Sequence, residues 1–140
     1  MHFNLIDRIL ERSDSRIVTL KQVTAAEEYL QDHFATFPVL PGVMMLEAMV
    51  QAARALAESR DPAAPPLVLG KVRALKYGRF VKPGAALRVE VTLAKAEGET
   101  LDFRGEATVL EPGAPADQAP TAVSGRFTLR PVRLAPQNPT

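Results

Sequence analysis

One long helix-forming segment, residues 43–59, lies among stretches that alternate with the period of a β-strand. It is rich in alanine, methionine and leucine, which favour helices. Apolar residues cover most of its circumference, so we expect the helix to be largely buried. Pro41 and Gly42 open it, because proline is tolerated where a first-turn N–H has no partner. The Asp61-Pro62 pair closes it. The fold must therefore wrap strands around one helix.

Apolar and polar residues alternate along much of the chain after Pro66. This one-sided alternation is typical of antiparallel strands with one face on the core and one in water. The clearest alternating stretches are residues 87–93, 101–109 and 123–129. We also expect strands at residues 5–10 and 16–23, and a long strand or bent pair at 67–81 that ends before the Pro83-Gly84 turn. Residues 111–120 read as a mobile hairpin loop.

The order of these segments predicts an α+β domain with five or six antiparallel strands curled around the central helix. Capping-box spacing at Thr24 to Glu27 predicts a short helix from Ala25 towards Gln31. We find no repeat, and we expect one domain over residues 1–130. The proline-rich end, residues 131–140, is expected to be a disordered tail.

Composition removes several classes of function. The chain contains no cysteine, which excludes disulfides, thiolate nucleophiles and cysteine-ligated metals. A formal net charge of +1 argues against nucleic acid as the main partner. Two histidines without a local cluster of acids make a metal site unexpected. Charged residues interrupt the N-terminal segment and the longest apolar run is short, so we expect neither a signal peptide nor a membrane span but a soluble cytoplasmic protein.

Residues 33–51, HFATFPVLPGVMMLEAMVQ, hold the candidate chemistry. Gly42 has no Cβ, so a ligand can approach the free N–H groups at the positive end of the helix, where an oxyanion would be stabilised. Glu47 lies about a turn and a half further on, and Gln51 is on the same face, four residues later. His33 lies fourteen residues before Glu47. A base, an acid and an oxyanion site are what proton abstraction next to a carbonyl requires.

Each of these residues also has a structural interpretation. His33 could be a hydrogen-bonded turn residue. Glu47 could form a buried ion pair with an arginine such as Arg54 or Arg79. A Pro-Gly pair before a helix commonly marks only the helix start. The residues by themselves leave both interpretations open.

The same stretch resembles the hotdog-fold (3R)-3-hydroxyacyl-(acyl-carrier-protein) dehydratases of FabZ type. That family has a Gly-His-Phe-Pro, then Pro-x-x-Pro-Gly-Val, then a helix with Glu-Ala and a following Gln. The matching positions here are His33, Phe34, Pro38, Pro41, Gly42, Val43, Glu47, Ala48 and Gln51. Related dehydratase/isomerases carry aspartate at the acid position, so glutamate favours the dehydratase-only type. The resemblance covers about residues 3–130, although Asp32 and Ala35 replace the family's glycine and proline and the leading segment is shorter than the family's.

The resemblance implies a homodimer whose two sheets join side by side, with higher assembly such as a trimer of dimers compatible with it. Its active sites would lie at the interface, where His33 of one chain faces Glu47 of the other. His33 would remove the α-proton of a 3-hydroxyacyl thioester, the Gly42 N–H would hold the thioester oxygen, and Glu47 would protonate the departing hydroxyl. Gln51 would orient Glu47.

The resemblance also implies that Phe34, Val43 and other apolar residues of the helix border an acyl tunnel. The substrate would be carried by acyl carrier protein, and no cofactor is needed. The alternatives are an acyl thioesterase with the same fold, a dehydratase of a specialised polyketide or lipid pathway, and a non-catalytic acyl-thioester-binding subunit.

Overall fold

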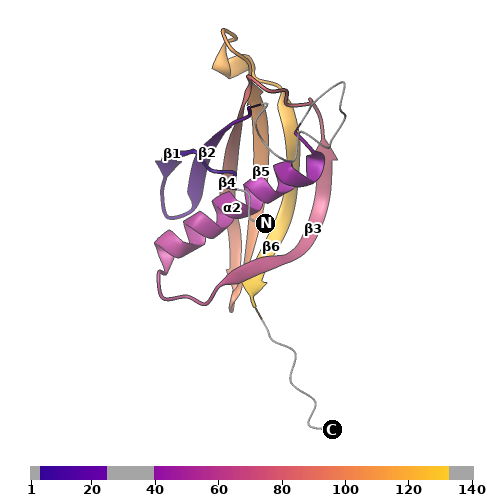
Figure 1. Ribbon diagram of the computed structural model, residues 1–140. Helices are drawn as coiled ribbons and strands as arrows, with labels where there is room; N and C mark the ends of the chain where they lie inside the picture. The colour runs from indigo at the N-terminus through magenta and orange to yellow at the C-terminus, as the bar shows by residue number, and fades with distance from the viewer. Residues whose placement is uncertain (1–3, 25–39, 133–140) are drawn as a thin grey trace.

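The computed structural model describes residues 4–24 and 40–132, which form one helix against a six-stranded antiparallel sheet (Figure 1). The elements are β1 (Arg8–Arg12), β2 (Arg16–Gln22), α2 (Gly42–Arg60), β3 (Leu67–Tyr77), β4 (Ala86–Glu97), β5 (Thr100–Leu110), a 3-10 turn (Ala116–Gln118) and β6 (Thr121–Pro131). The strand order is β1-β2-β4-β5-β6-β3. The chain thus crosses from one edge of the sheet, through α2, to β3 at the other edge. The expected α+β hotdog architecture is confirmed, with six strands.

Helix α2 runs across the inner face of the sheet, and the sheet curves around it (Figure 1). Eight of its residues are buried: Met45, Ala48, Met49, Val50, Ala52, Ala53, Leu56 and Ala57. They meet the inward side chains of the central strands, where the Phe103 and Phe127 rings stack with centroids 5.7 Å apart. Small alanines let the helix approach the sheet closely, and the aromatic pair supplies buried apolar area.

Backbone contacts fix the start of α2. The Leu40 N–H donates to the Val81 carbonyl at 2.8 Å, and the Leu40 side chain is 1% exposed. Pro41 then takes the N-cap position, with φ −60° and ψ 144° and no side-chain cap. A Cβ on Gly42 would lie 2.9 Å from the Tyr77 ring. Glycine therefore lets the helix begin in close contact with the Tyr77 ring at the end of β3.

Several boundaries differ from the sequence expectation. The first strand is Arg8–Arg12 rather than residues 5–10. Leu5 lies before the strand, where it is buried and its N–H donates a hydrogen bond to the Gln51 side chain. The long strand ends at Tyr77 rather than near residue 81. Residues 111–120 form a loop with a single 3-10 turn. The helix predicted from Ala25 lies outside the described residues, as do residues 133–140 of the predicted tail.

Within residues 4–24 and 40–132, no helix is long and apolar enough to cross a membrane.

Candidate active site

The first turn of α2 presents backbone donors at the end of the molecule where β3 finishes. The amides of Gly42 and Val43 stand in the first turn, where an N–H has no intrahelical acceptor. No acidic side chain occupies this turn to neutralise the helix dipole. The arrangement can therefore accept a partial negative charge from a ligand.

Glu47 lies further along the helix and has two neighbours on the same face. Gln51 donates from Nε2 to Oε1 of Glu47 at 3.4 Å. Arg54 places a terminal nitrogen 3.7 Å from the same oxygen. The i to i+4 contact between Glu47 and Gln51 that the sequence predicted is confirmed. Both contacts are made to Oε1 of Glu47. Neither contact involves Oε2, which can therefore bind another group.

Backbone groups outside the helix hold both of these neighbours. The Leu5 N–H donates to Oε1 of Gln51 at 2.8 Å, which fixes the amide so that its NH₂ group points to Glu47. Arg54 donates from Nε to the Leu67 carbonyl at the start of β3, at 3.1 Å. The carboxylate is thus oriented from the N-terminal segment and from β3 at once.

The burial of Glu47 corrects one expectation. One interpretation of the sequence was a buried ion pair between Glu47 and an arginine, but the Glu47 and Arg54 side chains are each 38% exposed in the single chain. The apolar stripe of α2 faces the sheet, whereas Glu47 lies at its margin. Arg54, one of the two arginines suggested as a partner, does form an ion pair with Glu47. It is a partly solvated pair rather than a buried one.

The structure brings together four of the six predicted site residues on α2: Gly42, Val43, Glu47 and Gln51. His33 and Phe34 lie outside the described residues. Sequence reasoning missed the anchoring roles of the Leu5 amide and the Leu67 carbonyl. No sequence pattern marks a backbone group for such a role.

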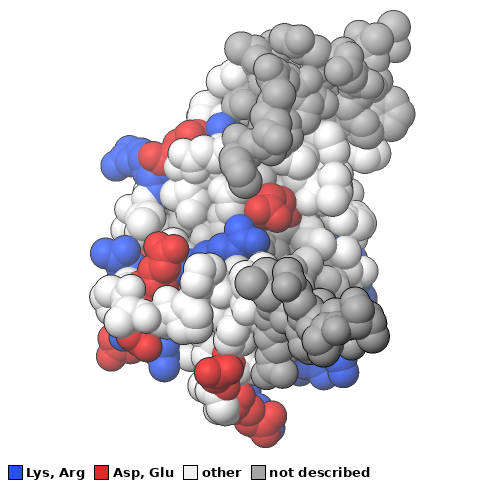
Figure 2. Space-filling model, turned by 60° about the horizontal axis from the view of Figure 1, so that its bottom comes forward, with Lys and Arg blue, Asp and Glu red and all other residues white. Residues whose placement is uncertain are grey.

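Large apolar side chains are exposed around the start of α2. Val43 is 66% exposed, Phe80 62% and Tyr77 52%. The Tyr77 ring contacts the Gly42 region, and Phe80 precedes the Val81 carbonyl that bonds to Leu40. Exposed apolar residues gathered at one place mark a surface that is covered by a ligand or a partner. On the face shown in Figure 2, acidic and basic side chains of the described residues are interspersed.

A single helix wrapped by a curved antiparallel sheet of six strands defines the hotdog class. A dehydratase heterocomplex from Xenorhabdus doucetiae shares this fold, with a TM-score of 0.71 and 18% identity over 93% of this chain and 84% of that one. A hypothetical thioesterase with coenzyme A from Streptococcus pneumoniae also shares it, with a TM-score of 0.67 and 12% identity over 88% and 83% of the two chains. These two likenesses establish the fold.

The family follows from sequence. The model of the FabA-like domain matches residues 1–111, and the chain belongs to this family. It is 42% identical over 111 residues to the 3-hydroxyacyl-(acyl-carrier-protein) dehydratase FabZ of Magnetococcus marinus, covering 76% of this chain and 72% of that enzyme. It is 43% identical over 110 residues to the enzyme of the same name from Pelotomaculum thermopropionicum, covering 76% and 78%.

Proposed function

We propose that this protein dehydrates (3R)-3-hydroxyacyl thioesters, carried by acyl carrier protein, to trans-2-enoyl thioesters in fatty acid or related lipid synthesis. Family membership and the identity to dehydratases of FabZ type support this reaction. The observation that carries it is the Glu47 carboxyl, oriented by Gln51 and Arg54, on the helix that begins at Gly42. An acid held in one orientation beside free backbone donors suits an elimination next to a carbonyl.

The proposed reaction assigns one step to each residue. His33 takes the α-proton, and charge develops on the thioester oxygen, which the Gly42 N–H stabilises. The C–O bond at the 3-position then breaks, and Glu47 protonates the leaving hydroxyl so that water departs. Oε2 of Glu47 suits this donation, because the contacts with Gln51 and Arg54 use Oε1. No cofactor takes part.

The acyl chain would lie along exposed apolar residues. Val43, the most exposed of the large apolar side chains, follows Gly42 directly, so an acyl group bound there would cover it. Phe34 completes the proposed lining, together with other apolar residues of α2. Covering this surface would stabilise the complex in proportion to the apolar area removed from water.

The proposed assembly is a homodimer joined through β3. This eleven-residue strand is the outer strand of the sheet beside β6, and most of its residues are exposed. An open edge of this length is a template for pairing, and a second copy would continue the sheet. The dimer would bring His33 of one chain to Glu47 of the other, and a trimer of dimers is a further possibility. We expected the hotdog domain to end at residue 130, but β6 includes Pro131, so we place the end of the domain there, with the tail after it and the protein in the cytoplasm.

A crotonyl thioester of acyl carrier protein tests the reaction in the hydration direction. Addition of the protein should lower the enoyl absorbance without releasing free thiol. Thiol release without loss of the enoyl group would assign the protein to the thioesterases. The absence of both changes, with thioester binding retained, would indicate a non-catalytic binding subunit.

A mixing experiment tests the shared site. His33→Ala and Glu47→Gln chains, each inactive alone, are exchanged under conditions in which subunits mix. With equal amounts of the two chains, random exchange makes half of the dimers mixed. Each mixed dimer would contain one native site of two, so about a quarter of the native activity should return. If proven exchange restores no activity, the two residues belong to one chain.

A further inference from the structure

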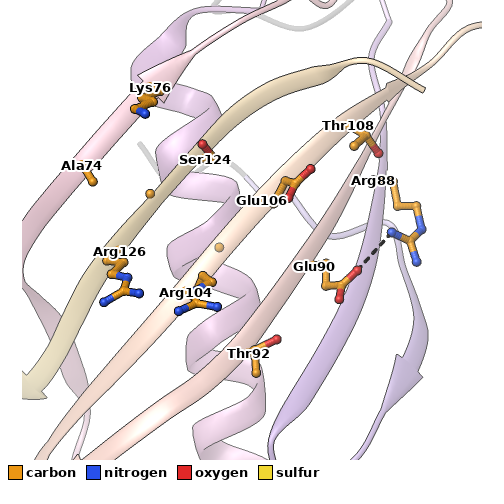
Figure 3. Close-up of a pocket in the computed structure, with 12 residues that line it drawn as sticks. Ala74, Lys76, Arg88, Glu90, Thr92, Arg104, Glu106, Thr108, Ser124 and Arg126 are labelled. Carbon is orange, nitrogen blue, oxygen red and sulfur yellow. Dashed lines mark hydrogen bonds and ion pairs between the residues drawn. The ribbon is translucent and has the colours of Figure 1, made fainter. Parts of the chain in front are cut away.

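The face of the sheet opposite α2 carries a hollow of about 370 Å³. Its charged lining consists of Lys76, Arg88, Arg104, Arg126, Glu90 and Glu106 (Figure 3). Helix α2 lies behind the sheet in this view, so the hollow is separate from the Glu47 cluster. Four basic and two acidic side chains give the lining a formal charge of +2.

Strand register arranges these charges in rows across the sheet. Arg104 stands directly opposite Arg126 of β6, and Arg126 is in turn opposite Arg73 of β3. The neighbouring row places Glu106 opposite both Glu90 and Ser124. Three arginines thus follow one another across adjacent strands, beside a row that holds two carboxylates.

Most arginines of this face are neutralised by a neighbour. Arg16 donates to Glu90 at 2.9 Å, Arg88 approaches the other oxygen of Glu90 at 3.4 Å, and Arg73 pairs with Asp102 at 3.1 Å. Figure 3 draws only one interaction among the lining residues, between Arg88 and Glu90.

Arg104 and Arg126 differ from these arginines. Within residues 4–24 and 40–132, no carboxylate lies within ion-pair distance of either guanidinium, nor of Lys76. Glu106, in the neighbouring row, accepts a hydrogen bond from the Thr121 hydroxyl at 3.2 Å. Like charges directly opposite one another on a sheet are destabilising. A bound anion would remove this cost.

We propose that Arg104 and Arg126 bind the phosphoryl group of a small phosphate monoester in this hollow. Each guanidinium offers paired N–H donors that match two phosphoryl oxygens. The Lys76 ammonium and the Ser124 hydroxyl line the same hollow and add donors from β3 and β6. Two register shifts in β3, the second of which contains Ala74 at φ 53°, bring Lys76 opposite Ser124.

The acidic row limits what can bind. Glu90 and Glu106 would repel a long polyanion such as nucleic acid, whereas a single phosphoryl group can contact the arginine row alone. A second copy of the same face is also disfavoured, because two surfaces of charge +2 would meet. A hollow of 370 Å³ accommodates a phosphoryl group with a small organic body.

Titration of the full-length protein with inorganic phosphate and with glycerol phosphate tests the site, followed by backbone amide shifts in NMR spectra. Saturable shifts are expected at residues 104–106 and 124–126, with dissociation constants in the millimolar range and tighter binding of the monoester. Replacing both arginines with glutamine (Arg104→Gln with Arg126→Gln) should weaken phosphate binding at least tenfold. The control Arg130→Gln removes an exposed arginine of β6 outside the hollow and should leave binding unchanged.

Thermal unfolding supplies an independent measurement. Without phosphate, the double variant should melt no lower than the native protein, because a like-charge contact is removed. Phosphate should raise the melting temperature of the native protein and of Arg130→Gln, but not that of the double variant. The proposal fails if no saturable shifts occur at the hollow, or if the double variant and Arg130→Gln respond equally. Enoyl hydration should be unchanged in all variants, since the hollow is on the other side of the sheet.

Discussion

Two charged clusters lie on opposite sides of the same sheet and satisfy their charges in opposite ways. Glu47 on α2 has a hydrogen-bond donor and a cation on one oxygen, each held by a backbone group elsewhere in the fold. Arg104 and Arg126 stand opposite each other with no carboxylate at contact distance among the described residues. The first cluster is organised before a ligand arrives, as catalysis requires. The second is completed only when an anion binds.

The largest expected effect comes from removing the ionisable group of the first cluster. Glu47→Gln keeps the size of the side chain but cannot donate the proton, so turnover should fall by about a hundredfold or more. His33→Ala should do the same. Steady-state kinetics with a crotonyl thioester measures the loss, and circular dichroism controls for folding. Near-native turnover of Glu47→Gln would show that Glu47 has only a structural role, as a partner of Arg54.

A smaller effect is expected from the residue that orients Glu47. Arg54→Ala removes the cation beside Oε1 and the bond to the Leu67 carbonyl, so kcat should fall by about tenfold while KM changes little. Arg54→Lys should recover part of the rate, because it restores the charge. Arg60→Ala, at the exposed end of the same helix, is the matched control. Equal rates for Arg54→Ala and Arg60→Ala would show that the orientation of Glu47 does not depend on Arg54.

The smallest expected effect is on the stability that Glu90 gains from its ion pairs with Arg16 and Arg88 on the outer face. The hydrogen bond from Arg16, together with its charge, lowers the pKa of Glu90 below its usual value of 4.5, against the opposing effect of burial. A lowered pKa in the folded state adds stability above the unfolded pKa and loses it as the pH falls through the folded one. Urea midpoints of the native protein and Glu90→Gln should therefore differ at pH 7 and converge below about pH 4.5. Glu99→Gln, in an exposed turn, should show no such pH dependence. A constant difference between the native protein and Glu90→Gln across this range would show that the pair does not act through charge.

The central strands and the long helix could be predicted because their sequences obey one period. Leu87, Val89 and Val91 alternate with polar residues and are buried in β4 as expected. The Pro41-Gly42 pair and the Asp61-Pro62 pair bound α2 to within a residue. The edges were harder to predict. All five residues of β1 are exposed, so no alternation fixes its register, and the two shifts in β3 break its period.

Only part of the candidate site could be read from the sequence. Helical spacing placed Gln51 beside Glu47, and that contact is confirmed. The choice of Arg54 over Arg79 as the ion-pair partner needed the structure, because the direction in which Arg54 reaches is set by the Leu67 carbonyl. The opposition of Arg104 and Arg126 depends on strand register, which alternation alone does not give.

Gly105 in β5 lies between helix α2 and the hollow on the outer face of the sheet. Its inward side would carry a Cβ only 2.7 Å from the Met49 sulfur of α2, and the same residue lines the hollow on the outer face. At this point only the backbone of β5 separates the helix from the hollow. A side chain placed there would have to displace the Met49 thioether, so glycine at this position leaves room for the methionine side chain between α2 and β5. A residue without a side chain therefore determines how closely Met49 packs against the middle of the sheet.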